Sequence, residues 1–270
     1  MKYFFILLFT IGLSKLSLAQ EGTLQKFDLK ITYELSYLGD STDLNTKRSE
    51  STLLFIQGDN SLFETANSHL RDSLDFISVT EGERKYSYFN YKIVREGDKL
   101  ITYDNILPNR YESGSEGYSY LEEVSDLDWK LSEDTLSING AVCQKATVTF
   151  GNRQWIAYFD PSIPISEGPY KFKGLPGLII QVSDSQDHWS FSLTNIEEGD
   201  QQFLATIEPV VNFPLIEKKA FFKNKRSAEN NFVEIQEAKH GRNPDPIKRE
   251  RINKSFRKAL QVRSNWIELY

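Results

Sequence analysis

A regular alternation of apolar and polar residues near the start of the chain constrains its fold more than any other feature. The apolar positions are Phe27, Leu29, Ile31, Tyr33, Leu35 and Tyr37. A period of two places every second side chain on the same face of a β-strand, so this segment is predicted to be a strand with one buried face. Its backbone groups need neighbouring strands as partners, and a β-rich fold is expected.

Short apolar runs separated by turn residues continue along most of the chain. Further strands are predicted over 51–57, 61–64, 86–94, 99–103, 127–131, 142–150, 155–159, 178–182 and 189–193. Asn139-Gly140 and Gly151-Asn152 are typical turn pairs between two such runs. Because no helices alternate with these strands, the fold class is expected to be mainly β (α+β). The predicted architecture is an antiparallel, curved multi-stranded sheet or open half-barrel with one or two C-terminal helices.

The C-terminal part of the chain has a different character. Helices are predicted over 216–239, with fraying near Asn231, and over 247–262, separated by a glycine- and proline-containing break. Residues 217–270 hold 14 of the 32 lysines and arginines but only 7 of the 38 acidic residues. A basic helical segment, 216–270, is therefore expected to pack on, or extend from, a β domain over 20–215. It either docks on the acidic body or binds an anionic partner.

The first 19 residues have the features of a cleavable signal peptide. Lys2 precedes a short apolar run over 3–13, and Ser17 and Ala19 supply small residues before the predicted cleavage point. The run is too short to span a bilayer, and no cysteine stands at the cleavage point to carry a lipid. The sequence predicts an exported protein, periplasmic or extracellular, with no transmembrane segment after cleavage.

The most distinctive motif follows a proline-rich stretch. Residues 174–179 read Gly174-Leu175-Pro176-Gly177-Leu178-Ile179. Pro176 and Gly177 are the central residues that a type II turn prefers, so a turn is predicted here, leading directly into a central strand. The prolines before the motif are expected to keep 160–169 extended along a surface or a sheet edge.

This motif and its surroundings resemble the GLPGLI family of exported bacterial proteins. The similar features are Gly140, Cys143-Gln144-Lys145-Ala146, the strand with Trp155, Ile163-Pro164-Ile165 and Gly168-Pro169-Tyr170-Lys171-Phe172. The resemblance covers about 126–184 and departs at Ala141-Val142, where an aromatic residue is expected. The family has no established activity, so the resemblance implies export and a fold but no function.

Catalytic and metal-binding signatures are missing from the sequence. It contains no nucleophile elbow, phosphate loop or dinucleotide fingerprint, and its three histidines share no metal-ligand spacing. Asp184, Asp187 and His188 stand together, as either a solvated turn or a metal site. Cys143 cannot form a disulfide within the chain and is expected to be a buried thiol. No cofactor, metal or nucleic-acid partner is predicted.

The chain is rich in aromatic residues, with 18 phenylalanines, 13 tyrosines and 4 tryptophans. The candidate binding residues near the motif are Arg153, Trp155, Tyr170 and Lys171. Arg153, Asp160, Lys171 and Lys173 form either a polar site or a set of surface charges. The sequence favours a non-catalytic cell-envelope binding or carrier protein for an apolar or peptide ligand. The alternatives are an accessory docking component of an outer-membrane complex and an envelope hydrolase.

Overall fold

A single antiparallel sheet dominates the structure. The computed structural model describes residues 24–72, 87, 89–106, 117–123, 127–207 and 213–270, without the side chains of 71–72 and 199–202. Within these residues eleven strands pair in the order β6-β5-β4-β3-β2-β1-β11-β10-β9-β8-β7. The strands are β1 (Leu24–Leu38), β2 (Lys47–Gln57), β3 (Asn60–Thr65), β4 (Lys92–Glu96), β5 (Lys99–Asn105), β6 (Gly117–Glu123), β7 (Lys130–Ile138), β8 (Ala141–Phe150), β9 (Arg153–Asp160), β10 (Leu178–Asp184) and β11 (Trp189–Thr206). The predicted fold class is confirmed. The predicted signal peptide, 1–19, lies outside the described residues.

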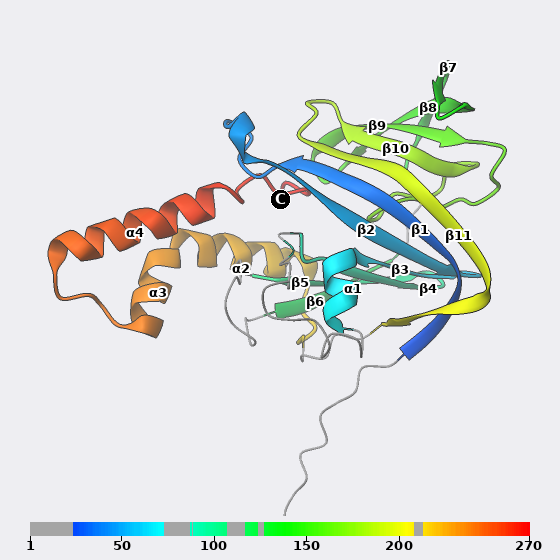
Figure 1. Cartoon of the computed structure of the whole chain (residues 1–270). Coiled ribbons are helices and arrows are strands. Elements are labelled where there is room, and N and C mark those ends of the chain that lie inside the picture. Colours follow the sequence, from blue (N-terminus) through cyan, green and yellow to red (C-terminus); the bar gives the residue numbers. More distant parts are fainter. Residues whose placement is uncertain (1–23, 73–86, 88, 107–116, 124–126, 208–212) are drawn as a thin grey trace, which may run out of the picture.

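The sheet is strongly curved around its longest strands. β1 and β11 pair over almost their whole length, with register shifts at Phe27/Leu29 and Thr32/Tyr33 in β1. Such irregularities bend a strand and increase its twist. Figure 1 shows β1, β2 and β11 curving so that β3–β6 face β7–β10 across the interior. The sheet therefore forms an open half-barrel whose open side lies toward the C-terminal helices.

The alternation in β1 has the predicted consequence. Ile31, Tyr33 and Leu35 are completely buried, whereas the residues between them are partly exposed. The Tyr33 hydroxyl donates a hydrogen bond of 2.8 Å to the carbonyl of Ile179 on β10. The central strand predicted over 178–182 is confirmed as β10, between β9 and β11.

The predicted turns are confirmed at the two hairpins but not in the motif. Asn139 and Gly140 both have positive φ, of 51° and 87°, as do Gly151 and Asn152, both at 56°. Gly177 has no positive φ, so the predicted type II turn at Pro176-Gly177 is wrong. Glycine is needed at 177 for space, because a Cβ atom there would lie 2.2 Å from the carbonyl oxygen of Asp160. The positive φ in the motif belongs to Gly174, at 93°.

The motif segment, residues 161–177, fills the interior of the half-barrel. It begins on the surface as predicted, but from Gly168 onward it turns inward, and Tyr170, Phe172 and Leu175 are buried. The ring of Phe172 lies 4.6 Å from that of Trp155, and Tyr170 reaches Phe63 on β3 at 6.3 Å. The face beneath β9 and β10 is thus occupied by the chain's own side chains.

The helices lie at the open side and on one face of the sheet. They are η1 (Leu44–Thr46), α1 (Ala66–Asp72), α2 (Lys218–Asn230), α3 (Phe232–His240) and α4 (Pro246–Gln261). The single helix predicted over 216–239 is divided at Asn231, where ψ is 17°. The Asp245 carboxylate accepts hydrogen bonds from the backbone N–H groups of Ile247 and Lys248, and Pro246 occupies the first turn, so α4 begins where its sequence predicts. No helix in the described residues is long and apolar enough to cross a membrane.

Residues 263–270 return from α4 into the half-barrel. Trp266, Ile267 and Glu268 are buried. The backbone N–H of Asn265 donates to the carbonyl of Gly39, and that of Leu269 donates to the carbonyl of Gly151. The C-terminal segment therefore joins β1 to the β8–β9 hairpin.

Candidate ligand-binding pocket

Arg153 is buried and binds the C-terminal segment. Its guanidinium donates to the Asp184 carboxylate at 2.8 Å, to the Trp266 carbonyl and to the Asn265 side chain at 2.5 Å. Because Arg153 and Asp184 are only 4% and 2% exposed, the interpretation of Arg153 as a surface charge is wrong. All of these partners belong to the chain itself, so Arg153 acts here as a structural residue.

Lys171 and Tyr170 are buried around a second residue of the C-terminal segment. Lys171 Nζ lies 2.7 Å from Glu268 Oε1 and 2.5 Å from Glu122 Oε2, and the Tyr170 hydroxyl donates to Glu268 at 2.5 Å. Lys218 Nζ lies 2.8 Å from the other Glu268 oxygen. Burial alone would raise the pKa of Glu268, but Lys171 and Lys218 outweigh it and lower that pKa to about 2.

Most of the remaining residues singled out by the sequence are also internal. Trp155 is fully buried and its indole N–H donates to the carbonyl of Phe150 at 3.0 Å. Asp160 is buried, so the alternative in which it is a surface charge is wrong. Lys173 is half-buried. Cys143 is buried, and burial raises the pKa of its thiol, as expected for an unreactive cysteine.

The group Asp184, Asp187 and His188 is a structured turn. Asp184 Oδ1 accepts hydrogen bonds from the backbone N–H groups of His188 and Trp189, at 2.7 and 3.0 Å. Its other oxygen accepts from Arg153. In the described part of the chain no three histidine, cysteine or acidic side chains come together in a way that could hold a metal ion.

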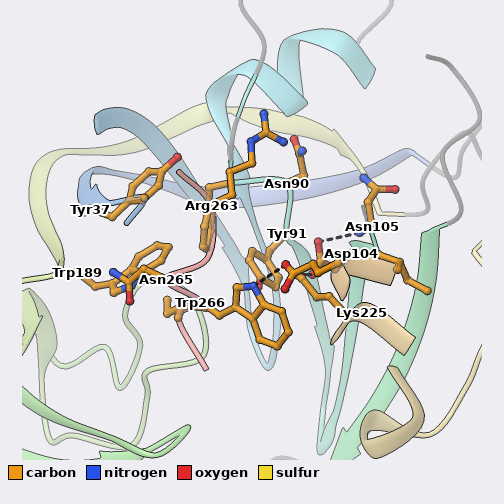
Figure 2. A pocket seen from close by; sticks show the side chains of 15 residues that line it. Tyr37, Asn90, Tyr91, Asp104, Asn105, Trp189, Lys225, Arg263, Asn265 and Trp266 are labelled. Atoms are coloured by element: carbon orange, nitrogen blue, oxygen red, sulfur yellow. Dashed lines mark hydrogen bonds and ion pairs between the residues drawn. The ribbon is translucent and has the colours of Figure 1, made fainter. Parts of the chain in front are cut away.

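A pocket lies elsewhere, at the open side of the half-barrel. It has a volume of about 80 Å³, which is room for several water molecules or one side chain of a ligand. Its walls come from β1, β5, β11, α2, the residues that precede β4 and the residues that follow α4. The lining residues are Tyr37, Gly39, Phe89, Asn90, Tyr91, Asp104, Asn105, Ile106, Trp189, Lys225, Glu229, Arg263, Asn265, Trp266 and Ile267. Figure 2 shows them around the pocket, with Arg263 and Asn90 at one end.

One wall of the pocket is aromatic. The rings of Tyr37 and Trp189 stack in parallel with their centroids 4.7 Å apart, and Phe89 lies 5.8 Å from Trp189 and 4.6 Å from Tyr91. Trp189 is only 4% exposed, and its indole N–H has no hydrogen-bond partner among the described residues. A buried donor without a partner costs free energy and calls for an explanation, such as an acceptor supplied by a ligand.

The opposite wall carries buried charges. Lys225 on α2 lies 2.7 Å from Asp104 on β5. Burial alone would lower the pKa of Lys225, but the Asp104 carboxylate outweighs it and raises that pKa. One turn further along α2, Glu229 accepts a hydrogen bond of 3.0 Å from the indole N–H of Trp266.

Burial raises the pKa of Glu229 from 4.5 to about 7, against the opposing effects of Lys225, Trp266 and Arg226. Between these two values the native protein holds a proton that the unfolded chain releases. The contribution of Glu229 to the free energy of unfolding must therefore fall as the pH rises from about 4.5 to about 7. We expect Glu229→Gln to gain stability relative to the wild-type chain over this window, as measured by urea unfolding at several pH values. Parallel pH profiles for the two proteins would contradict the prediction.

These pocket residues are not the candidates that the sequence indicated. They come from segments far apart in the chain, and each looks unremarkable in its own segment. The one available signal was the basic α2 helix with a glutamate four residues after Lys225, which is also a common pattern on solvent-exposed helices. This spacing therefore does not indicate that the residues surround a pocket.

Comparison with known proteins supports the likeness to an uncharacterised family. A family model described as "Protein of unknown function (Porph_ging)" matches residues 149–181, which include β9, the motif segment and the start of β10. Membership of the GLPGLI family itself stays a prediction. No curated protein matches this chain.

Two solved structures of PNGF-II are similar to this chain, one in space group C2 and one in space group P21. Both are 12% identical to it, with TM-scores of 0.47 and 0.49. In each comparison 74% of this chain is covered but only 33% of PNGF-II, so the chain spans about a third of that protein's length. At this level of similarity no functional property passes from PNGF-II to this chain.

Proposed function

We propose that this chain is a non-catalytic binding protein that receives one aromatic or apolar side chain of a peptide ligand in the pocket beside Trp189. The observation that carries the proposal is the stacked aromatic wall, with a buried indole N–H that has no partner among the described residues. Aromatic walls with a few polar groups are typical of small-ligand pockets. A peptide also brings carbonyl oxygens, which are the acceptors that an indole N–H requires.

The position of the pocket favours this site over the motif segment. The interior beneath β10 is filled by Trp155, Phe172 and Leu175, which are all fully buried or nearly so. The candidate residues Arg153, Tyr170 and Lys171 are held by internal partners. None of these residues lines the pocket at the open side, so a ligand there need not displace them.

Binding of N-acetyl-phenylalanine amide tests the proposal. We expect this probe to shift the indole N–H signals of Trp189 and Trp266 in NMR spectra, whereas N-acetyl-alanine amide shifts neither. Asn90→Trp, at the end of the pocket, is expected to abolish the shifts. A matched control is Val142→Trp, because Val142 is 64% exposed on β8, away from the pocket. If the phenylalanine probe leaves both signals in place, the proposal is wrong.

The indole N–H of Trp189 can be tested on its own. Trp189→Phe keeps a ring in the aromatic wall but removes the donor. We expect the free energy of unfolding to change by less than about 1 kcal/mol, because losing an unpaired buried donor offsets part of the lost packing. The affinity for the phenylalanine probe should fall about fivefold to tenfold, the value of one hydrogen bond. Unchanged affinity would show that the ligand does not accept a hydrogen bond from Trp189.

A further inference from the structure

Helices α3 and α4 form an arm that projects from the body of the protein, here defined as residues 232–261. Figure 1 shows both helices standing away from the sheet, joined to it through α2 at one end and the C-terminal segment at the other. The two helices pack on each other, with the rings of Phe232 and Phe256 5.9 Å apart. The arm is thus a helical hairpin anchored to the body at both ends.

The acidic groups of the arm are mostly used inside it. Glu237 on α3 accepts hydrogen bonds from Arg249 at 2.5 Å and from Asn253 at 3.0 Å, both on α4. These contacts lower the pKa of Glu237 to about 2, the bonds from Arg249 and Asn253 being the largest causes. The negative charge of Glu237 is therefore neutralised at the α3–α4 contact. The acidic residue of α4, Glu250, is exposed, and its Oε1 lies 3.3 Å from Arg257 Nη1 on the same helix.

The outer face of α4 is basic. Asn253 is buried and Phe256 and Leu260 are half-buried, and these three residues mark the inner face. A helix repeats every 3.6 residues, so the opposite face carries Ile247, Arg251, Lys254 and Lys258. All four side chains are exposed, and the three basic ones have no ion-pair partner in the described part of the chain. Ile247 is 83% exposed at the tip of the arm.

We propose that the outer face of α4 binds the anionic headgroups of a lipid surface. Helices with exposed lysines and arginines beside an apolar side chain bind such surfaces through charge attraction and shallow insertion. The headgroup layer is negatively charged, and the outer face presents a row of three positive charges, those of Arg251, Lys254 and Lys258. Ile247 supplies the apolar contact. Lys248 and Arg257 are also exposed and lie on either side of this line, but Arg257 pairs with Glu250 and adds no net charge to the face. The inference is independent of the pocket and of its ligand.

Sedimentation of the full chain with lipid vesicles tests the inference. We expect binding to vesicles of equal parts phosphatidylglycerol and phosphatidylcholine, little binding to pure phosphatidylcholine, and loss of binding when the salt concentration is raised to about 0.5 M. The triple variant R251E/K254E/K258E should partition at least about 100-fold less strongly, since each basic residue near an anionic surface contributes about fivefold.

The matched control is K26E/K99E/K130E, which changes the net charge equally at three exposed lysines of the sheet. It should keep at least about a tenth of the wild-type partition, because only long-range attraction is reduced. Ile247→Ser should weaken binding while leaving its dependence on salt unchanged.

Circular dichroism checks that α4 is intact. If α4 unfolds in the triple variant, the single variant R251Q replaces it, and its partition is expected to fall about fivefold. Equal binding of wild-type and triple variant, or no binding to anionic vesicles, would overturn the inference. So would retention of the wild-type chain on immobilised polyglutamate alone, since the partner would then be an acidic protein.

Discussion

Replacing Arg153 by methionine is expected to lower the free energy of unfolding by about 3–5 kcal/mol. The substitution leaves the Asp184 carboxylate, which is only 2% exposed, without its cation. Removing one partner of a buried ion pair is strongly destabilising because the other charge stays buried and uncompensated. The carbonyl of Trp266 and the side chain of Asn265 lose their donor in the same step.

The effect is measured by urea unfolding, with two further variants. Arg251→Met is the matched control, since Arg251 is exposed on α4, and its stability should change by less than about 0.5 kcal/mol. Adding Asp184→Asn to Arg153→Met should recover part of the loss, because the unpaired charge disappears while the acceptor for His188 and Trp189 remains. A loss below about 1 kcal/mol for Arg153→Met would show that solvent reaches this ion pair.

The difference between local contacts and distant ones, such as those of Arg153, explains which parts of the fold could be predicted from the sequence. Strands and hairpins depend on neighbouring residues, so the alternation in β1 and the turn at Asn139-Gly140 predicted them correctly. The break near Asn231 was also visible, because polar residues interrupt the helical pattern there. Arg153, in contrast, looks like a surface residue after a turn. Only the return of the C-terminal segment, more than a hundred residues later, buries it.

The candidate pocket shows the same limit more clearly. Lys225 and Asp104 are 121 positions apart in the chain, and their contact exists only because α2 packs across the open side of the half-barrel. Trp189 appeared as an ordinary apolar residue of a strand. Its unpaired indole N–H is a property of the folded surroundings, which no local pattern encodes. Chemistry that depends on such distant contacts leaves little trace in a single sequence.

Replacing Gly177 by alanine is expected to destabilise the fold by about 3 kcal/mol or more, beyond the usual cost of a small overpacking substitution. The new Cβ atom would lie 2.2 Å from the Asp160 oxygen, 2.7 Å from the Asp160 carbonyl carbon and 2.9 Å from Pro161 Cα. All three are backbone atoms, so no side chain can rotate away. Asp160 pairs with Leu178 across β9 and β10, and the clash must therefore separate two central strands or shift the motif segment.

A glycine in open space provides the contrast. Gly58 has a φ of 54°, and a Cβ atom there would meet nothing within 4 Å, so Gly58→Ala should cost only the conformational penalty of about 1–2 kcal/mol. Thermal and urea unfolding of both variants measures the difference. If Gly177→Ala is no more destabilising than Gly58→Ala, the close approach of the two chain segments is not what requires glycine in this motif. A larger cost at Gly177 would instead mean that the motif's second glycine is needed because the chain passes directly against the backbone at the end of β9.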